Sequence, residues 1–252
     1  EVVLDSLLLG RRTEADGTTR QEVLLVAAQR TMIMNLLTAV RRAGLKVLGI
    51  DVSSLALLRA LIADSPFLPD PKAGAVCDAV IDISSSVSTL AVAVDGIMKF
   101  TRIINFSSER FGRSLAETHG IPVEDAQALV NHVGLAGPLA PDADVYREDV
   151  VQEVQTTLAK IAAELGDELK RSFDYYQAQQ HAVPVTRLIL SGRGALVRNL
   201  DTRLAELLAL PVSLADPLTH VVDNSSSMTD EALVAMAPSL SVAVGLVLPE
   251  SD

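Results

Sequence analysis

The sequence lacks several features that mark familiar classes of protein. Only one of its 252 residues is a cysteine, Cys77, so no disulfide can form within the chain, and a reducing compartment is favoured. Tryptophan is absent and aromatic residues make up 3%, so a core must be built mainly from Leu, Val, Ile and Ala. The most apolar stretch, Leu240 to Leu248, is far shorter than the ~20 residues of a membrane-spanning helix.

Positive charge is also scarce. The formal net charge of −11 argues against nucleic-acid phosphate as the main partner. The four histidines are scattered without metal-ligand spacing, and there is no P-loop, dinucleotide-binding fingerprint or G-x-S-x-G elbow. The chain does not begin with methionine and opens at once in strand-like composition. We therefore expect a fragment of a longer protein.

What is present falls into two patterns along the chain. Residues 1–52 predict two strands, a helix and a third strand over Lys46–Val52, which together make a small β-β-α-β unit. A helix with Ser53 or Ser54 as its N-cap is expected next. The proline-rich residues 66–74 then predict a linker and a domain boundary.

From Ala79 onward the predicted order is β-β-β-α-α-α-β-α-β-α. The dipeptide Asp95-Gly96 predicts a tight hairpin between the second and third of these strands. Three antiparallel strands followed by alternating helices and strands resemble the ribonuclease-H-like half of an actin-like ATPase, so we predict an α/β chain of that fold. The fold needs two such halves around a nucleotide cleft, and we identify one, which also favours a fragment.

The end of the first of these strands carries the most suggestive motif. Asp82 is followed almost at once by Ser84, Ser85 and Ser86. In actin-like ATPases a loop of small residues at this point lets backbone N–H groups approach phosphate, while the aspartate holds a water bound to Mg²⁺. The family usually has glycine where this chain has Ser84, whose Cβ would strain a positive φ. The alternative is an ordinary hairpin whose serines bond their own backbone.

A second motif follows a later buried strand. Ser191, Gly192, Arg193 and Gly194 end that strand, and a helix is predicted over 195–210. In the actin-like fold this turn lies under the adenine and ribose, where glycines allow close approach. The alternative is a plain turn between a strand and a helix.

A third candidate lies on the long helix predicted over Arg147–Gln180. Glu168 and Arg171 are three residues apart and so share a helix face. In the fold family a charged pair at this place contacts the ribose. The alternative is a solvated ion pair worth roughly a few tenths of a kcal/mol.

Taken in order, several segments together resemble the PilM family of type IV pilus assembly proteins, which is related to the division protein FtsA. They include "VIDISSSVSTLAVAVDGIMKFTRII", "ELKRSFDYYQAQ", "LILSGRGALVRNLDTRLAELLALPV" and "APSLSVAVGLVL". The resemblance implies that residues 1–52 are part of a small inserted subdomain. It places residues 53–74 and 232–252 in the first large subdomain, and residues 75–231 in a second large domain with a helical lid.

The same resemblance carries an expected function. Members of the family are cytoplasmic and peripheral to the inner membrane, bind ATP with Mg²⁺, and bind the N-terminal tail of the membrane protein PilN, which ties together the inner-membrane platform. The peptide groove would lie near the helix Thr31–Arg42 and the strand Val47–Val52. Efficient hydrolysis is not expected, because no clear base for an attacking water is present. A small-molecule kinase, an FtsA-like filament protein and an actin-like protein that has lost its nucleotide are the alternatives.

Overall fold

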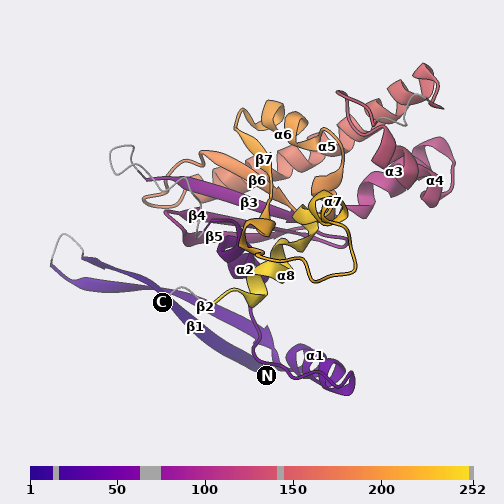
Figure 1. The fold of residues 1–252 in the computed structure, drawn as a ribbon. Helices are drawn as coiled ribbons and strands as arrows, with labels where there is room; N and C mark the ends of the chain where they lie inside the picture. Colours follow the sequence, from indigo (N-terminus) through magenta and orange to yellow (C-terminus); the bar gives the residue numbers. More distant parts are fainter. Residues whose placement is uncertain (14–16, 63–74, 141–144, 250–252) are drawn as a thin grey trace. The chain divides into compact units, whose positions relative to one another are not determined.

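The computed structural model of the chain contains two compact units, Glu1–Asp51 and Val52–Asp252, which are drawn in Figure 1. The linker predicted at residues 66–74 lies outside the residues that the structure describes. Those described residues are 1–13, 17–62, 75–140 and 145–249.

The first unit is a two-stranded ribbon followed by a helix. Strand β1 (Val2–Thr13) pairs antiparallel with β2 (Thr19–Gln29), and α1 (Arg30–Arg42) follows directly. Gly44, with φ +76°, ends the helix by donating its N–H to the carbonyl of Arg41 at 3.0 Å. Among its described side chains none is buried, so this unit has no core of its own.

The third strand predicted for this unit is wrong. Residues Lys46–Val52 are irregular, and no described strand pairs with them. Their alternating Val, Leu and Ile residues match a strand pattern, but a strand forms only where a neighbouring edge can satisfy its backbone N–H and C=O groups. The described unit is therefore β-β-α rather than β-β-α-β.

The second unit is built on a five-stranded sheet. The first three strands are antiparallel neighbours, as predicted, and the last two join the sheet in parallel. Asp95 and Gly96 both have positive φ, 49° and 80°, which confirms the predicted tight hairpin. The spatial order is β5 (Ile97–Ile104), β4 (Ser88–Val94), β3 (Cys77–Ile83), β6 (Arg187–Ser191) and β7 (Val212–Leu214).

Helices cover both faces of this sheet (Figure 1). Their bounds are α2 (Ser53–Leu61), α3 (Glu109–His119), α4 (Val123–His132), α5 (Glu148–Gln177), α6 (Leu200–Leu208), α7 (Asp230–Ala235) and α8 (Ser241–Val247). Short 3₁₀ turns are η2 (Arg193–Leu196), η3 (Pro217–His220) and η4 (Ala237–Leu240).

Alternation along β3 decides which side chains meet which helices. Ala79, Ile81 and Ile83 belong to the core shared with α3, α4, α5 and α6. Asp78 and Asp82 alternate with them and so point to the opposite face, on which α2 packs. Helix α8 packs in turn on α2. The candidate aspartate thus faces the side of the sheet that carries the C-terminal segment.

Two predicted helix starts need correction. Val52, not Ser53 or Ser54, is the N-cap of α2, and the buried Ser54 hydroxyl has no hydrogen-bond partner. A side-chain cap requires an extended serine just outside the helix, but both serines lie within it. The helix predicted over 195–210 begins only at Leu200, since a 3₁₀ turn and the left-handed Asn199 precede it.

Candidate functional site

The ends of β3 and β6 bring the first two sequence motifs together. The two strands are parallel neighbours, and Asp82 is directly in register with Ser191. The Ser191 hydroxyl donates to Asp82 Oδ1 at 2.9 Å, and the Ser84 hydroxyl donates to Asp82 Oδ2. Asp82 is only 7% exposed. Its charge is held by two neutral hydroxyls, and within the described residues it has no cationic partner.

The serine loop after Asp82 is open to solvent. Ser84 is partly buried, while Ser85 and Ser86 are exposed. Within the described part of the chain, no hydrogen bond uses the backbone N–H of Ser85 or Ser86, and none of the three hydroxyls bonds the backbone of the loop. Two adjacent unpaired N–H groups are the arrangement that binds anions in backbone nests.

The strain expected at Ser84 is absent. Ser84 is not among the residues with positive φ, so its Cβ fits the loop without penalty. Its carbonyl accepts a hydrogen bond from the N–H of Ser108 at 2.8 Å, which anchors the start of the loop to the segment before α3. Replacement of the usual glycine therefore leaves the loop conformation accessible.

The glycines of the second motif are explained by contact with β3. Gly192 has φ +81° and ψ +175°, a region that only glycine adopts readily. A Cβ there would lie 2.7 Å from the backbone N of Ile83, and one on Gly194 would lie 2.3 Å from Ile83 Cγ2. Arg193 between them is exposed. The glycines thus seat the turn against the strand that carries Asp82, and their contact with a nucleoside stays a prediction.

The third motif forms the expected ion pair. Arg171 Nη2 lies 2.6 Å from Glu168 Oε1, and both side chains are substantially exposed. Helix α5 belongs to the core on the sheet face opposite Asp82, where Ser172 contacts Arg102 of β5 at 3.3 Å. No hydrogen bond or ion pair among the described residues joins this pair to the Asp82 loop. A ribose contact by Glu168 and Arg171 therefore stays a prediction.

The chemistry of the donors suits a hydrated magnesium ion. Asp82 and the hydroxyls of Ser84 and Ser191 offer only oxygen, which hard cations prefer. In the described ranges, no three His, Cys, Asp or Glu side chains gather as a direct metal-binding cluster. A cation here would be held through water and phosphate rather than in a cage of side chains, as predicted for Asp82.

Two further groups around Asp82 were not predicted as part of the site. Ser191 is fully buried, and its hydroxyl also lies 3.1 Å from the carbonyl of Pro238. The N–H of Gly192 donates to the same carbonyl at 2.8 Å. Ser191 could have been found from the pairing of strand ends, because both motifs close neighbouring strands. No local signal marks Pro238, which is far away in sequence.

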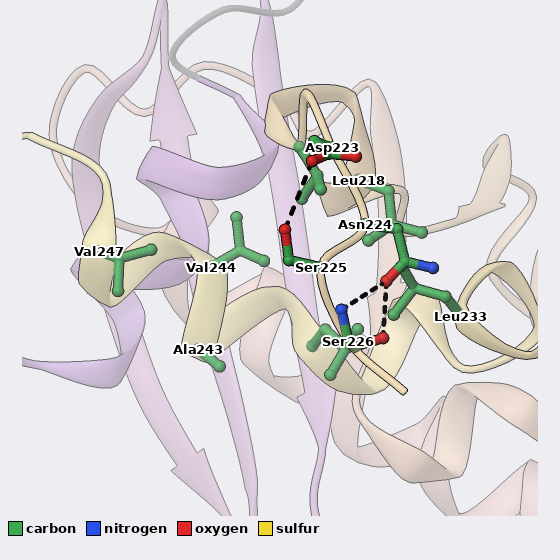
Figure 2. Close-up of a pocket in the computed structure, with 11 residues that line it drawn as sticks. Leu218, Asp223, Asn224, Ser225, Ser226, Leu233, Ala243, Val244 and Val247 are labelled. Carbon is green, nitrogen blue, oxygen red and sulfur yellow. Dashed lines mark hydrogen bonds between the residues drawn. The ribbon is translucent and has the colours of Figure 1, made fainter. Parts of the chain in front are cut away.

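A hollow of about 320 Å³ lies elsewhere in this unit, between α7, α8 and the loop before α7 (Figure 2). Its floor is apolar and includes Val244. Asn224 shapes the rim by accepting a hydrogen bond from the N–H of Ser226 at 3.1 Å. The only ionisable side chain in its lining is Asp223. The lining of this hollow is therefore mainly apolar and supplies few groups that could take part in chemistry.

No helix in the described part of the chain combines the length and apolar character needed to cross a membrane.

Known proteins resemble this chain in sequence. Cell division protein FtsA of Escherichia coli (strain K12) is 23% identical over 243 residues, covering 90% of this chain and 54% of FtsA. FtsA of Bacillus subtilis (strain 168) is 24% identical over 245 residues, covering 94% of this chain and 53% of FtsA. The chain therefore spans about half the length of the curated relatives it matches.

Solved structures show the fold. The "PilM-PilN type IV pilus biogenesis complex" aligns with a TM-score of 0.75 at 22% identity, over 97% of this chain and 65% of that one. MreB5 of Spiroplasma citri bound to ADP aligns with a TM-score of 0.58 at 15% identity, over 87% and 64% of the two chains. These likenesses confirm the predicted actin-like fold. The family model described as type IV pilus assembly protein PilM matches residues 1–251, and the chain belongs to that family.

Proposed function

We propose that the carboxyl ends of β3 and β6 form one wall of an ATP site. The observation that carries this proposal is a nearly buried carboxylate without a cationic partner, Asp82, beside a loop with unpaired N–H groups. The N–H groups of Ser85 and Ser86 would donate to phosphate oxygens, and Ser84, whose hydroxyl donates to Asp82, would lie beside the water on the magnesium ion. Asp82 would accept hydrogen bonds from water on Mg²⁺, which neutralises phosphate charge when bound.

The nucleoside would lie against the turn formed by Gly192, Arg193 and Gly194, with Glu168 and Arg171 toward the ribose. The shared fold with MreB5, solved with ADP, supports this arrangement. We expect binding without efficient hydrolysis. Within the described residues, no second acid or histidine contacts the Asp82 carboxylate to activate a water.

Calorimetric titration of Mg-ATP into the full-length protein tests this site. We expect micromolar binding that Asp82→Ala weakens at least tenfold, because the hydrated cation loses its acceptor. Asp125→Ala, an exposed acid on α4, is the matched control and should bind as the unsubstituted protein does. Unchanged affinity in Asp82→Ala would remove Asp82 from the site. Absence of binding by the unsubstituted protein would favour an actin-like scaffold without nucleotide.

We further propose that the protein binds the cytoplasmic N-terminal tail of PilN, and that it reaches the inner membrane through this partner and the other platform proteins. Family membership supports this, as does the fold shared with the solved complex of PilM with PilN. The first unit leaves many apolar side chains exposed, among them Met32 (60%), Leu36 (54%) and Leu48 (89%). Such a surface is typical of a site that a partner covers.

Fluorescence anisotropy with a labelled PilN tail peptide tests the partner. Leu36→Asp should weaken peptide binding at least tenfold, because it places a charge within the apolar surface of α1. Arg42→Asp, at the end of the same helix, places the same aspartate outside that apolar group by reversing an existing charge, and serves as the control. Equal binding by both variants and the unsubstituted protein would exclude α1 from the peptide site.

A further inference from the structure

We propose that Ser191 is a positioning residue that fixes one oxygen of Asp82, and that Ser84 is a removable cap on the other. The inference rests on the proposed nucleotide site and assigns the two carboxylate oxygens different roles. It concerns hydroxyl groups that hold the aspartate rather than groups that touch the nucleotide.

The Ser191 hydroxyl has one hydrogen and two acceptors within reach. Asp82 Oδ1 lies at 2.9 Å and the Pro238 carbonyl at 3.1 Å. That carbonyl also receives the N–H of Gly192 at 2.8 Å and the Ser241 hydroxyl at 3.1 Å. Since a carbonyl oxygen has two lone pairs, Pro238 is satisfied without Ser191. The hydrogen therefore goes to the carboxylate, where a charge-assisted bond is stronger.

The two oxygens of Asp82 face different surroundings. Oδ1 lies on the inner side, since a Cβ on Gly192 would come within 2.8 Å of it. Oδ2 is on the side of the serine loop, where the partly buried Ser84 hydroxyl donates to it. A metal-bound water that approaches from the loop side would meet Oδ2, where it would share or displace the Ser84 hydroxyl. Oδ2 is therefore the functional oxygen, and Oδ1 is the anchor.

This arrangement predicts opposite effects for two serine-to-alanine changes. Ser191→Ala releases the anchor, so the carboxylate can rotate away from the loop and binding that depends on Mg²⁺ weakens. Ser84→Ala removes the competing hydroxyl, so the same binding strengthens. Ser88 supplies a matched control, because its hydroxyl is also fully buried in this sheet but donates to the carbonyl of Phe106 at 2.7 Å.

The experiment is calorimetric titration of ATP into the full-length protein, once with Mg²⁺ and once with EDTA. We expect Ser191→Ala to lower Mg-ATP affinity about five- to tenfold and to leave the affinity in EDTA unchanged. Ser84→Ala should raise Mg-ATP affinity about two- to fivefold, and Ser88→Ala should change neither value. Ser191→Cys fills nearly the same space with a weaker donor and should give a smaller loss, which covers a failure of Ser191→Ala to fold.

Three outcomes overturn the inference. If Ser191→Ala binds Mg-ATP as Ser88→Ala does while the unsubstituted protein also binds it, Ser191 is not a positioning residue and the proposed site stays intact. An equal loss with Mg²⁺ and with EDTA assigns Ser191 a purely structural role. Failure of the unsubstituted protein to bind ATP overturns both this inference and the proposed function.

Discussion

Two aspartates on the same face of β3, Asp78 and Asp82, have nearly the same burial and opposite surroundings. They are 5% and 7% exposed. At the amino end of the strand, Asp78 receives two hydrogen bonds from Arg187, at 2.5 Å from Nε and 3.1 Å from Nη2. At the carboxyl end, Asp82 accepts hydrogen bonds from two neutral hydroxyl groups, those of Ser84 and Ser191. Because the two aspartates are buried to a similar extent, burial does not distinguish them. The difference is that Asp78 pairs with a cation in a structural ion pair, whereas Asp82 has no cation and is the candidate site.

The surroundings of the two ends extend this contrast. The amino end is closed by Thr186, whose N–H and hydroxyl both donate to the carbonyl of Cys77 at 2.8 Å. The carboxyl end opens onto the exposed serine loop with its unpaired N–H groups. A buried charge without a counter-charge destabilises the folded state unless something binds it. The open end therefore carries an electrostatic penalty that a bound cation would relieve.

The largest expected effect comes from Gly192→Ala, which alters the turn that packs against the carboxyl end of β3. The new Cβ would meet the backbone of Ile83 at 2.7 Å and would hold a non-glycine residue in a glycine-only region. We expect a loss of roughly 3–5 kcal/mol in the free energy of unfolding, measured by urea denaturation. Gly96→Ala also has positive φ but meets nothing within 4 Å, so it should lose about 1 kcal/mol. Equal losses would show that the contact with β3 is unimportant.

The next largest effect is expected for Asp78→Asn, which removes the ion pair at the amino end of β3. It leaves the partly buried Arg187 guanidinium without its carboxylate, so we expect a loss of about 3 kcal/mol in the free energy of unfolding. The affinity of the folded protein for Mg-ATP should not change. A clear loss of nucleotide affinity with little loss of stability would reverse the roles assigned to the two ends.

A smaller stability change is expected for Asp82→Asn. The amide keeps the size of the carboxylate and removes a buried charge that has no cation, so unfolding should shift by less than about 1 kcal/mol in either direction. Mg-ATP affinity should still fall at least tenfold. Urea denaturation and calorimetry on the same samples compare it with Asp78→Asn. A loss near 3 kcal/mol in the free energy of unfolding would mean that Asp82, like Asp78, has a structural role.

A last effect concerns the closed end at high pH. Burial and, to a smaller extent, the hydrogen bond with Cys77 together raise the pKa of Tyr176 to about 12. The folded protein then keeps a proton that the unfolded chain releases from about pH 10, so stability falls as pH rises from about 10 to about 12. Tyr176→Phe should flatten this part of the stability curve. If the free energy of unfolding of Tyr176→Phe, measured by urea denaturation, falls with pH across that range as steeply as that of the unsubstituted protein, Tyr176 is not the group responsible.

Much of the second unit could be predicted from the sequence because its signals are local. The apolar runs of β3, β4 and β5 and the Asp95-Gly96 turn specify a meander by period and turn chemistry alone. The predicted order did not say which strands are neighbours, so the meeting of Asp82 with Ser191 was not predicted; it arises because β3 and β6 are parallel neighbours and end at the same edge of the sheet.

Other features depended on partners that local sequence does not specify. The pattern over Lys46–Val52 suits a strand, but none forms without a neighbouring edge. Ser53 and Ser54 suit a helix cap, but the helix begins one residue earlier in the chain than such a cap allows. The contact between the Ser191 hydroxyl and the Pro238 carbonyl joins residues 47 positions apart. Contacts of this kind arise from tertiary packing, and no periodicity predicts them.

The most direct test is a crystal structure of the full-length protein with Mg²⁺ and a non-hydrolysable ATP analogue. We predict that the phosphates lie against the N–H groups of Ser85 and Ser86, and that a metal-bound water lies within hydrogen-bond distance of Asp82 Oδ2. Asp78 should remain paired with Arg187. A nucleotide bound away from β3, or a magnesium ion with no water on Asp82, would contradict the central claim that the carboxyl end of this strand is a nucleotide site.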